Sequence, residues 1–487
     1  MKDALLYGML IYGVAAFVAA VAAVVVQLAF VAVAERLGSR LLASVPAIAL
    51  GAGAMMVVLS NRDLQVEAVF GGLGAESSGA AWATRLANLF LLAIAVAKLA
   101  QMLFAQQVRT QIATAAQDQS ASRRLFMAFL AYAVCSLLLP MVFGTVPGFS
   151  HDGLIAVPMF IAAYLGRKES LNGVLLSAKW ILLLIALASL ALAAVLPKLV
   201  VSSYMGGLIP GLPIRLWGLS SHPNVMGGMV ASLMLMLWMR PFSRRWLQAL
   251  AWLVAVIALF LTQSKSSWLA ALMAYGTLLI YRHGRDTNGR LHIGVWITLL
   301  LGAAVLASGL LFIDIDKVTS RFLDSDVGAG LSTLTGRTRI WQVALQVWLD
   351  SPWFGYGPDA WSPMHRMQLG VPYATTAHNQ LLQALSEGGL FDAVSMLVYF
   401  VLLGLAAVRT ATRTRGVSLA FFLVITARCV GEAPFSIGNM TSCDIVLHLI
   451  LFMMVVNEST ETALVSSAQS AHRDGSRLNY KGGLARA

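Results

Sequence analysis

The chain has 487 residues, of which 59% are hydrophobic and 11% are charged, and its mean hydropathy is +0.77. These values exclude an ordinary soluble globular protein and indicate that most of the chain lies in a membrane. The formal net charge of +12 does not imply nucleic-acid binding, because the basic residues concentrate in short connections between apolar segments. There they report membrane topology.

Apolar segments recur along the whole chain. A transmembrane helix needs about 20 apolar residues, and backbone polar groups in lipid must be satisfied within the segment, which favours helices. The expected segments are 5–34, 41–60, 83–104, 125–143, 154–167, 174–197, 223–239, 246–263, 267–282, 292–313, 389–408, 415–432 and 443–457. The sequence therefore predicts an all-α polytopic integral membrane protein with about 12 transmembrane helices.

The charge distribution predicts the orientation. Arginine and lysine are frequent in connections 35–40, 106–124, 167–169, 240–245, 281–290 and 409–415. The positive-inside rule places these connections in the cytoplasm. The N-terminal stretch is longer than the apolar part of a cleavable signal, so we expect it to be retained. If both termini are cytoplasmic the number of spans is even, which the 13 segments do not satisfy. The exact count and the N-terminal orientation stay open.

Four parts follow from this pattern. Residues 1–313 form transmembrane helices and include an outward loop, about 198–222, that is rich in glycine and proline. Residues 314–388 form one large polar loop on the outer side, 389–457 form the C-terminal transmembrane helices, and 458–487 form a cytoplasmic tail. The three cysteines lie in or beside apolar segments without the spacing of a disulfide or zinc site.

The large loop contains two expected helices. Residues 339–349 carry apolar side chains at helical spacing, and such a helix would lie along the outer leaflet. Thr375 or Thr376 would cap a second helix that starts near His378.

His378 is the strongest candidate for chemistry. Ionisable groups at a membrane are costly and are therefore functional by default. The positive end of a helix dipole disfavours an imidazolium, and a neutral imidazole is what a general base requires. The alternative interpretation is a structural histidine that is hydrogen-bonded at the interface.

Several cationic side chains lie on the same outer side of the membrane, where arginine and lysine are otherwise scarce. They are Arg215, Lys265, Arg337 and Arg339. Arginine binds phosphate bidentately and lysine binds it as a point charge. Each could instead snorkel or contact lipid headgroups. The sequence lacks a Walker loop, a His-x-x-x-His pair and a carboxylate pair with an evident third ligand. We therefore expect neither a metal nor any other cofactor.

Short motifs in this order resemble the O-antigen ligase family, the lipid A–core:surface polymer ligases, within the wider O-antigen ligase/polymerase group. The motifs are 221–224 (SHPN), 262–265 (TQSK), 336–341 (GRTRIW), 355–358 (GYGP), and His378-Asn379 followed by Gly389. The family pattern has a histidine, then Asn, Ser or Gln, nine residues and a glycine. Two positions depart from the family. Asp392 stands where a small or aromatic residue is usual, and Lys265 stands where arginine is more frequent.

The resemblance implies an activity and a place in the cell. Such enzymes transfer a glycan from undecaprenyl pyrophosphate to a sugar hydroxyl of lipid A–core, without metal or nucleotide. They are multi-pass proteins of the bacterial inner membrane, and their active site faces the periplasm. They resemble integral-membrane glycosyltransferases of the GT-C type and are thought to invert the anomeric centre. The implied partners are this lipid-linked donor, the lipid A–core acceptor and membrane lipids, with no nucleic acid.

The resemblance also assigns expected roles to residues. His378 would accept the proton of the attacking hydroxyl, and Asn379 would orient the imidazole or a phosphate. Arg215, with Lys265, Arg337 or Arg339, would hold the pyrophosphate. The expected supporting residues are His222, Asn224 and Trp341.

Three alternatives stay open. An O-antigen polymerase, or a ligase that glycosylates a protein hydroxyl, would use the same donor with another acceptor. A transporter of lipid-linked sugars would need no chemistry, but transporters usually place charges near the bilayer midplane. Here Lys98 and Lys179, and also Arg428 with Glu432, lie toward the ends of spans.

Overall fold

The computed structural model describes residues 40–60, 62–64, 78–104, 121–150, 152–167, 171–204, 209, 211–283 and 334–457. The expected spans 5–34 and 292–313, the first part of the large loop and the tail 458–487 lie outside the described residues.

The first half of the described chain is helical. Its helices are α2 (Arg40–Leu59), α4 (Ser78–Phe104), α6 (Ala121–Ala133), α7 (Leu139–Phe143), α8 (Asp152–Leu165), α9 (Asn172–Val195) and the short α10 (Pro197–Val200). A π-helical turn, η1 (Val134–Leu138), joins α6 to α7 without a break. The helices agree with the expected segments to within a few residues at most ends, because each apolar run must close its own backbone hydrogen bonds.

The second half opens with a small antiparallel ribbon. Strands β1 (Val201–Ser203) and β2 (Ile214–Leu216) pair so that Ser202 faces Arg215. The helices that follow are α11 (Pro223–Met239), α12 (Arg245–Thr262), α13 (Lys265–His283), α17 (Leu334–Asp350), α18 (Pro363–Gln368), α19 (Gln380–Ala411), α20 (Val417–Arg428) and α21 (Cys443–Val456).

Six helices among the described residues are long and apolar enough to cross a membrane. They are Arg40–Leu59, Gly79–Met102, Ala121–Phe143, Asn172–Val195, Arg245–Thr262 and Gln380–Ala411. Shorter apolar helices accompany them at Ile155–Leu165, Pro223–Met239, Val417–Arg428 and Cys443–Val456. The prediction of an all-α protein with several membrane-spanning helices is thus confirmed at this level.

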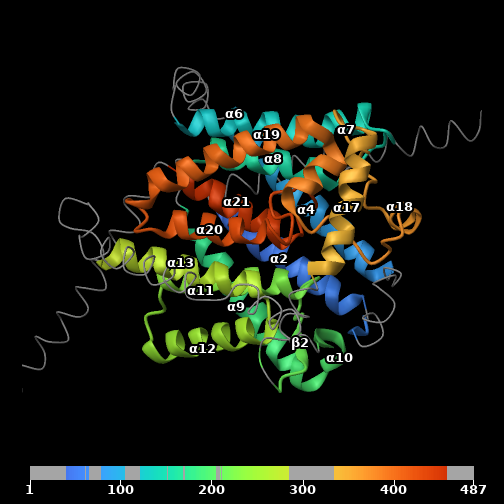
Figure 1. The fold of residues 1–487 in the computed structure, drawn as a ribbon. Helices are drawn as coiled ribbons and strands as arrows, with labels where there is room; N and C mark the ends of the chain where they lie inside the picture. The colour runs from blue at the N-terminus through green and yellow to red at the C-terminus, as the bar shows by residue number, and fades with distance from the viewer. Residues whose placement is uncertain are drawn as a thin grey trace, which may run out of the picture.

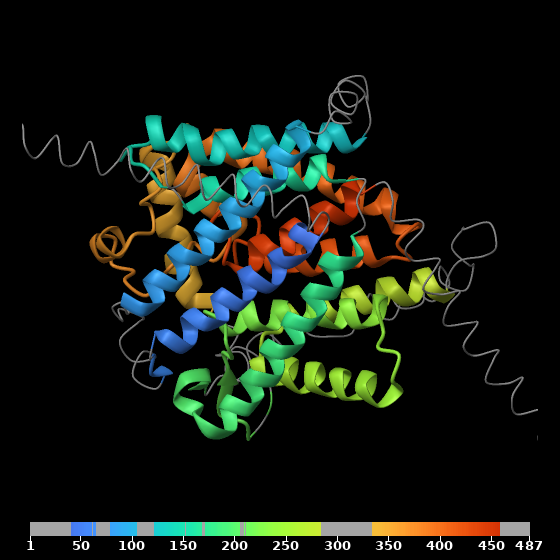
Figure 2. The same cartoon turned by 180° about the vertical axis from the view of Figure 1, so that it is seen from behind.

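The apolar helices pack side by side around a common core (Figure 1). Helices α4, α2 and α9 form a layer on the face seen in Figure 2. Helix α21 lies inside the bundle with nearly every residue buried. The core includes stacked rings such as Phe129 on Phe160 and Tyr132 on Tyr399.

Helix α17 runs crosswise to these helices, at the end of the bundle where α19 begins (Figure 1). Its apolar side, expected to face the outer leaflet, packs instead inside the large loop. A small core joins α17 to residues further along the loop: Ile340, Val343, Ala344, Val347, Ala360, Trp361, Val371, Ala374 and Ala377. Because these side chains are buried in the loop itself, they are not available to lipid.

Helix α19 begins at Gln380, close to the helix start expected near His378, and it continues through residue 389, where the span was expected to start. It is capped by Asn379, whose side-chain oxygen accepts from the backbone N–H of Leu381 and Leu382. The expected caps, Thr375 and Thr376, are therefore not the capping residues. The helix kinks at Gly389, where φ is 68°.

The segment 351–357 docks on this kink. The backbone N–H of Tyr356 donates to Ser386 O at 2.9 Å, and that of Leu390 donates to Pro352 O at 2.8 Å. Gly355 and Gly389 permit the approach, since a Cβ on either would lie 2.4 Å from backbone atoms of the other segment. This segment of the large loop is thereby fixed to the first turns of α19.

Candidate functional site

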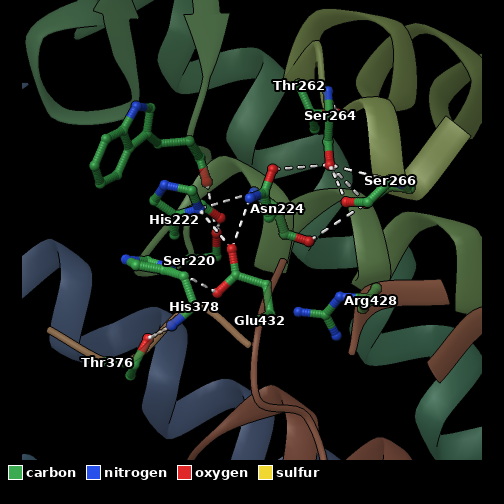
Figure 3. A network of polar contacts seen from close by, with 12 residues as sticks. Ser220, His222, Asn224, Thr262, Ser264, Ser266, Thr376, His378, Arg428 and Glu432 are labelled. Atoms are coloured by element: carbon green, nitrogen blue, oxygen red, sulfur yellow. Dashed lines mark hydrogen bonds and ion pairs between the residues drawn. The ribbon is translucent and has the colours of Figure 1, made fainter. Parts of the chain in front are cut away.

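Polar side chains from segments far apart in the sequence meet around Glu432 (Figure 3). Glu432 follows α20, His378 precedes α19, and His222 and Asn224 lie at the start of α11. Ser264, directly before α13, and Arg337, in the first turn of α17, complete the cluster. All of these elements end or begin on the side of the bundle that α17 crosses.

His378 and Glu432 form the central contact. The imidazole Nδ1 lies 3.5 Å from Oε2 of Glu432, and the two side chains are 17% and 11% exposed. His378 adopts a left-handed backbone conformation with φ of 48°, which non-glycine residues adopt at a cost. Its N–H donates to Oγ1 of Thr376 at 3.3 Å. The strained backbone directs the imidazole at the carboxylate.

Gln380 fixes the spacing between these two residues. Its backbone N–H donates to Cys429 O at 2.9 Å, and its side-chain oxygen accepts from the N–H of Phe435 at 2.7 Å. The segment of His378 is thereby bonded to the chain on both sides of Glu432. On the other side of His378, Ala377 N–H donates to the buried side chain of Gln383 at 2.6 Å.

Asn224 links the carboxylate to the cations. Its Nδ2 donates to Oε1 of Glu432 at 2.6 Å. Its Oδ1 accepts from Nη2 of Arg215 at 2.8 Å and from the hydroxyl of Ser264 at 2.9 Å. Arg215 also donates through Nε to Thr262 O at 2.8 Å. Part of the Arg215 guanidinium therefore holds Asn224 in place.

His222 plays a different role from His378. Its Nδ1 accepts from the N–H of Asn224 at 3.2 Å and so caps α11. The same nitrogen lies 3.7 Å from Oε1 of Glu432. Burial lowers the pKa of His222, and although Glu432 opposes this, the pKa stays below its ordinary value. The ring is neutral with its proton on Nε2, so it can donate there but cannot act as a base at that atom.

Glu432 is held as an anion. Burial alone would raise its pKa, but the contact with His378, the neighbouring His222 and the hydrogen bond from Asn224 outweigh burial and lower the pKa below its ordinary range. Nη2 of Arg337 lies 3.8 Å from Oε1. Arg428, close by in Figure 3, is engaged by Asp444.

The structure brings three of the four predicted cations together and separates the fourth. Arg337 packs against Gly431, where a Cβ would lie 2.6 Å from Nη1. Lys265 begins α13, and burial together with the charge of Arg215 lowers its pKa. Arg339 is exposed and lies near Gly370 instead. The predicted set thus divides between Arg337, which reaches Glu432, and Arg339, which does not.

The predicted supporting residues divide as well. His222 and Asn224 lie inside the cluster. Asn379 uses its side-chain oxygen to cap α19, so that atom is not directed at the imidazole. Trp341 is half-buried on α17, and within the described residues its indole N–H is buried without a hydrogen-bond partner.

Two residues of this region were not predicted as site residues. Glu432 was noticed only as a charge near the end of a span, although a lone carboxylate at the outer end of an apolar helix was a usable signal. Arg62 lies in a connection that is poor in base. It donates to the carbonyls of Leu199, Ser220 and Gly218 at 2.6–2.8 Å and so holds the loop that carries His222.

These contacts define a chemical capability. An imidazole backed by a carboxylate can remove a proton from a hydroxyl group. Neighbouring cations can neutralise negative charge that develops on a leaving group. The arrangement therefore suits removal of a proton from a hydroxyl beside a group that leaves with negative charge.

The family model described as O-antigen ligase matches residues 249–397, so this part of the chain is similar to that family. The matched segment contains Lys265, Arg337, Arg339 and His378. It does not contain Arg215, His222, Asn224 or Glu432. No curated protein matches the chain at a significant level.

Proposed function

We propose that this protein is an O-antigen ligase of the bacterial inner membrane. It transfers O-antigen polysaccharide from undecaprenyl pyrophosphate to a sugar hydroxyl of lipid A–core and so completes lipopolysaccharide. The observation that carries the proposal is the contact between His378 and Glu432 beside Arg215, Lys265 and Arg337. The family match supports the reaction class.

In the proposed reaction, Nε2 of His378 accepts the proton of the acceptor hydroxyl. The hydroxyl oxygen forms a bond to the anomeric carbon of the donor as the bond from that carbon to pyrophosphate breaks. The electron pair of the broken bond stays on the pyrophosphate. Attack from the face opposite the leaving group inverts the anomeric centre, as in GT-C-type glycosyltransferases.

Glu432 stabilises the imidazolium that forms on His378. A carboxylate at Nδ1 favours the tautomer whose Nε2 is free to accept a proton, and it compensates the positive charge once the proton has moved. The 3.5 Å separation is long for a hydrogen bond. Such contacts tighten when substrate is bound.

Three cations bind the pyrophosphate leaving group in this proposal. Arg337 and Lys265 approach the cluster from α17 and α13, and Arg215 has donors beyond those that hold Asn224. Fixed cations can neutralise a pyrophosphate without a metal ion or nucleotide, and we propose that the transfer is metal-independent.

The proposed location follows from the charge pattern. With the basic connections in the cytoplasm, the loops that carry His222 and His378 face the periplasm. There the lipid-linked donor and the lipid A–core acceptor reach the cluster from the membrane. Nothing in the geometry favours a transporter, which needs no base.

The test is transfer by purified protein supplied with undecaprenyl-pyrophosphate glycan and lipid A–core in EDTA. Wild-type protein is expected to produce a ladder of glycan-bearing lipid A–core, and His378→Ala is expected to lose about 10²–10⁴-fold in kcat. Equal activity of His378→Ala would remove the base assignment. Extension of the donor alone, with lipid A–core untouched, would make the protein a polymerase, and transfer only to a protein hydroxyl would make it a protein ligase.

A further inference from the structure

Arg337 and Arg339 face different parts of the protein. Residues two positions apart on a helix do not share a face. Arg337 packs on Gly431 beside Glu432. Nη2 of Arg339 lies 4.0 Å from the position that a Cβ on Gly370 would take. Arg339 therefore faces the turn that follows α18 and has no part in the cluster around His378.

A second arginine belongs to the same turn. The carbonyl of Arg366, on α18, accepts from the N–H of Val371 at 3.0 Å and closes the turn around Gly370. The Arg366 side chain is only 6% exposed. Its Nε and Nη1 are buried and have no hydrogen-bond partner among the described residues. A buried guanidinium without a counter-anion is destabilising, and an unsatisfied buried donor points to a ligand.

We propose that Arg339 and Arg366 form an anion subsite on the large loop, and that it binds a phosphate group on the headgroup of the acceptor glycolipid. Two guanidinium groups match the charge of a phosphate monoester, which is about −1.5 to −2 at neutral pH. A single carboxylate would require only one. This inference rests on the proposed function and adds a recognition element for one of its two substrates.

The position of the subsite assigns the phosphate to the acceptor. The pyrophosphate of the donor is bonded to the reacting carbon, so it must lie beside His378, with Arg337 and Lys265. Arg339 projects from another side of α17, and α18 lies farther from the helix bundle than α17 does in both views (Figures 1 and 2). A phosphate held there belongs to the other substrate.

The surface of α18 suits an amphiphile. Met364 and Met367 flank Arg366 in the sequence and are 69% and 53% exposed. Flexible, polarisable methionine side chains adapt to irregular apolar partners. A glycolipid that presents phosphate to Arg366 would place its apolar portion against these two residues.

The experiment compares wild type, Arg366→Gln, Arg339→Gln and a control, Arg413→Gln, which removes a charge that is exposed like that of Arg339 and lies beyond the far end of α19. Steady-state transfer is measured with two acceptors: lipid A–core, and lipid A–core from which a phosphatase has removed the phosphate groups. Binding of both acceptors to each protein is measured without donor. The expected result is an acceptor KM about tenfold higher for Arg366→Gln and Arg339→Gln, with unchanged kcat and donor KM. Dephosphorylation should abolish the difference between these variants and wild type.

Thermal unfolding separates ligand binding from a structural role. If Arg366 is held without a counter-anion, Arg366→Gln should unfold at the same or a higher temperature than wild type, whereas loss of a structural arginine would lower it. If Arg366→Gln and Arg339→Gln raise the donor KM, or leave the acceptor KM unchanged, the subsite inference is wrong. Transfer by the wild-type protein would still support the ligase proposal in that case. If wild type transfers nothing yet binds the phosphorylated glycolipid through Arg366, the subsite stands and the ligase proposal fails. Absence of both transfer and Arg366-dependent binding would overturn both.

Discussion

The side-chain amide of Asn224 donates a 2.6 Å hydrogen bond to Oε1 of Glu432 and joins the start of α11 to the loop after α20. The side-chain amide cannot flip by 180°, because its oxygen already accepts hydrogen bonds from Arg215 and Ser264. A donor is thus directed at the carboxylate before any substrate arrives. Arg215, predicted as a pyrophosphate ligand, also maintains this arrangement.

Replacing Glu432 by glutamine should lower kcat about 100-fold and leave both KM values nearly unchanged. The amide keeps the size of the side chain and an acceptor for Asn224, but it removes the negative charge that compensates an imidazolium on His378. Steady-state transfer assays measure the effect. Asp350→Asn, the same change at an exposed position at the end of α17, is the control. A Glu432→Gln enzyme with wild-type kcat would show that the carboxylate has no part in the reaction.

Replacing Asn224 by leucine should destabilise the fold by about 1–3 kcal/mol, because Glu432, Arg215 and Ser264 each lose a partner. Asn224→Asp keeps the acceptor for Arg215 but places a carboxylate against Glu432. Its stability should recover as the pH is lowered, since a protonated carboxyl can donate to Glu432. Thermal unfolding across pH measures both effects, with Gln342→Leu on the exposed side of α17 as control. A pH-independent Asn224→Asp defect would contradict this account.

Stability should fall as the pH drops below about 6.5, partly because of His222. Its pKa in the folded protein lies below the unfolded value. The unfolded chain therefore takes up a proton that the folded ring resists, and the stabilisation present above the unfolded pKa is lost on acidification. With 30% of the side chain exposed, water weakens the effect. His222→Asn keeps a good helix cap and should flatten the dependence of the unfolding temperature on pH between about 6.5 and 4.5. Glu432 acts in a lower window, below its unfolded pKa of about 4.3. An unchanged slope in His222→Asn would assign the loss to other groups.

Gly389→Ala should destabilise the protein strongly. A residue with a side chain at φ 68° and ψ −157° costs about 1–3 kcal/mol, and the new Cβ would lie 2.4 Å from the carbonyl carbon of Trp353. Displacement of the docked segment 351–357 adds to this. The control is Gly276→Ala on α13, where nothing lies within 4 Å of the new Cβ; there the stability should stay equal or rise by up to about 1 kcal/mol. The measurement is the unfolding temperature of the two variants. Equal values would contradict the docking of segment 351–357 on the kink at Gly389.

The helices were predictable because an apolar segment in lipid must satisfy its own backbone hydrogen bonds, which favours a helix. Helix α11 matches its expected bounds, and α12 and α13 begin and end within two residues of theirs. The helix expected to start near His378 is the beginning of α19, which starts at Gln380 and continues through the expected start of the span at residue 389. The capping residue of α19 was predicted wrongly. Its cap is one residue beyond His378, whose left-handed backbone is set by tertiary contacts rather than by local preference.

The site was predictable in part. His378 and the cations were identified from their scarcity on the outer side and from short motifs. The contacts of Glu432 with His378 and Asn224 depend on how α20 packs against α11, and no sequence spacing reports that. The separation of Arg337 from Arg339 depends on the rotation of α17 about its axis, which needs the fold.

Gln380 binds the chain on both sides of Glu432 through backbone atoms of Cys429 and Phe435. For evolution, this bracing constrains the number of residues in the turn more tightly than the identity of Cys429, whose contribution is a carbonyl that any amino acid supplies. A substitution at residue 429 would preserve the hydrogen bond to Gln380. A single insertion or deletion between 429 and 435 would instead move the Glu432 carboxylate out of reach of the His378 imidazole. Among distant relatives, the length of this turn should therefore vary less than the identity of residue 429.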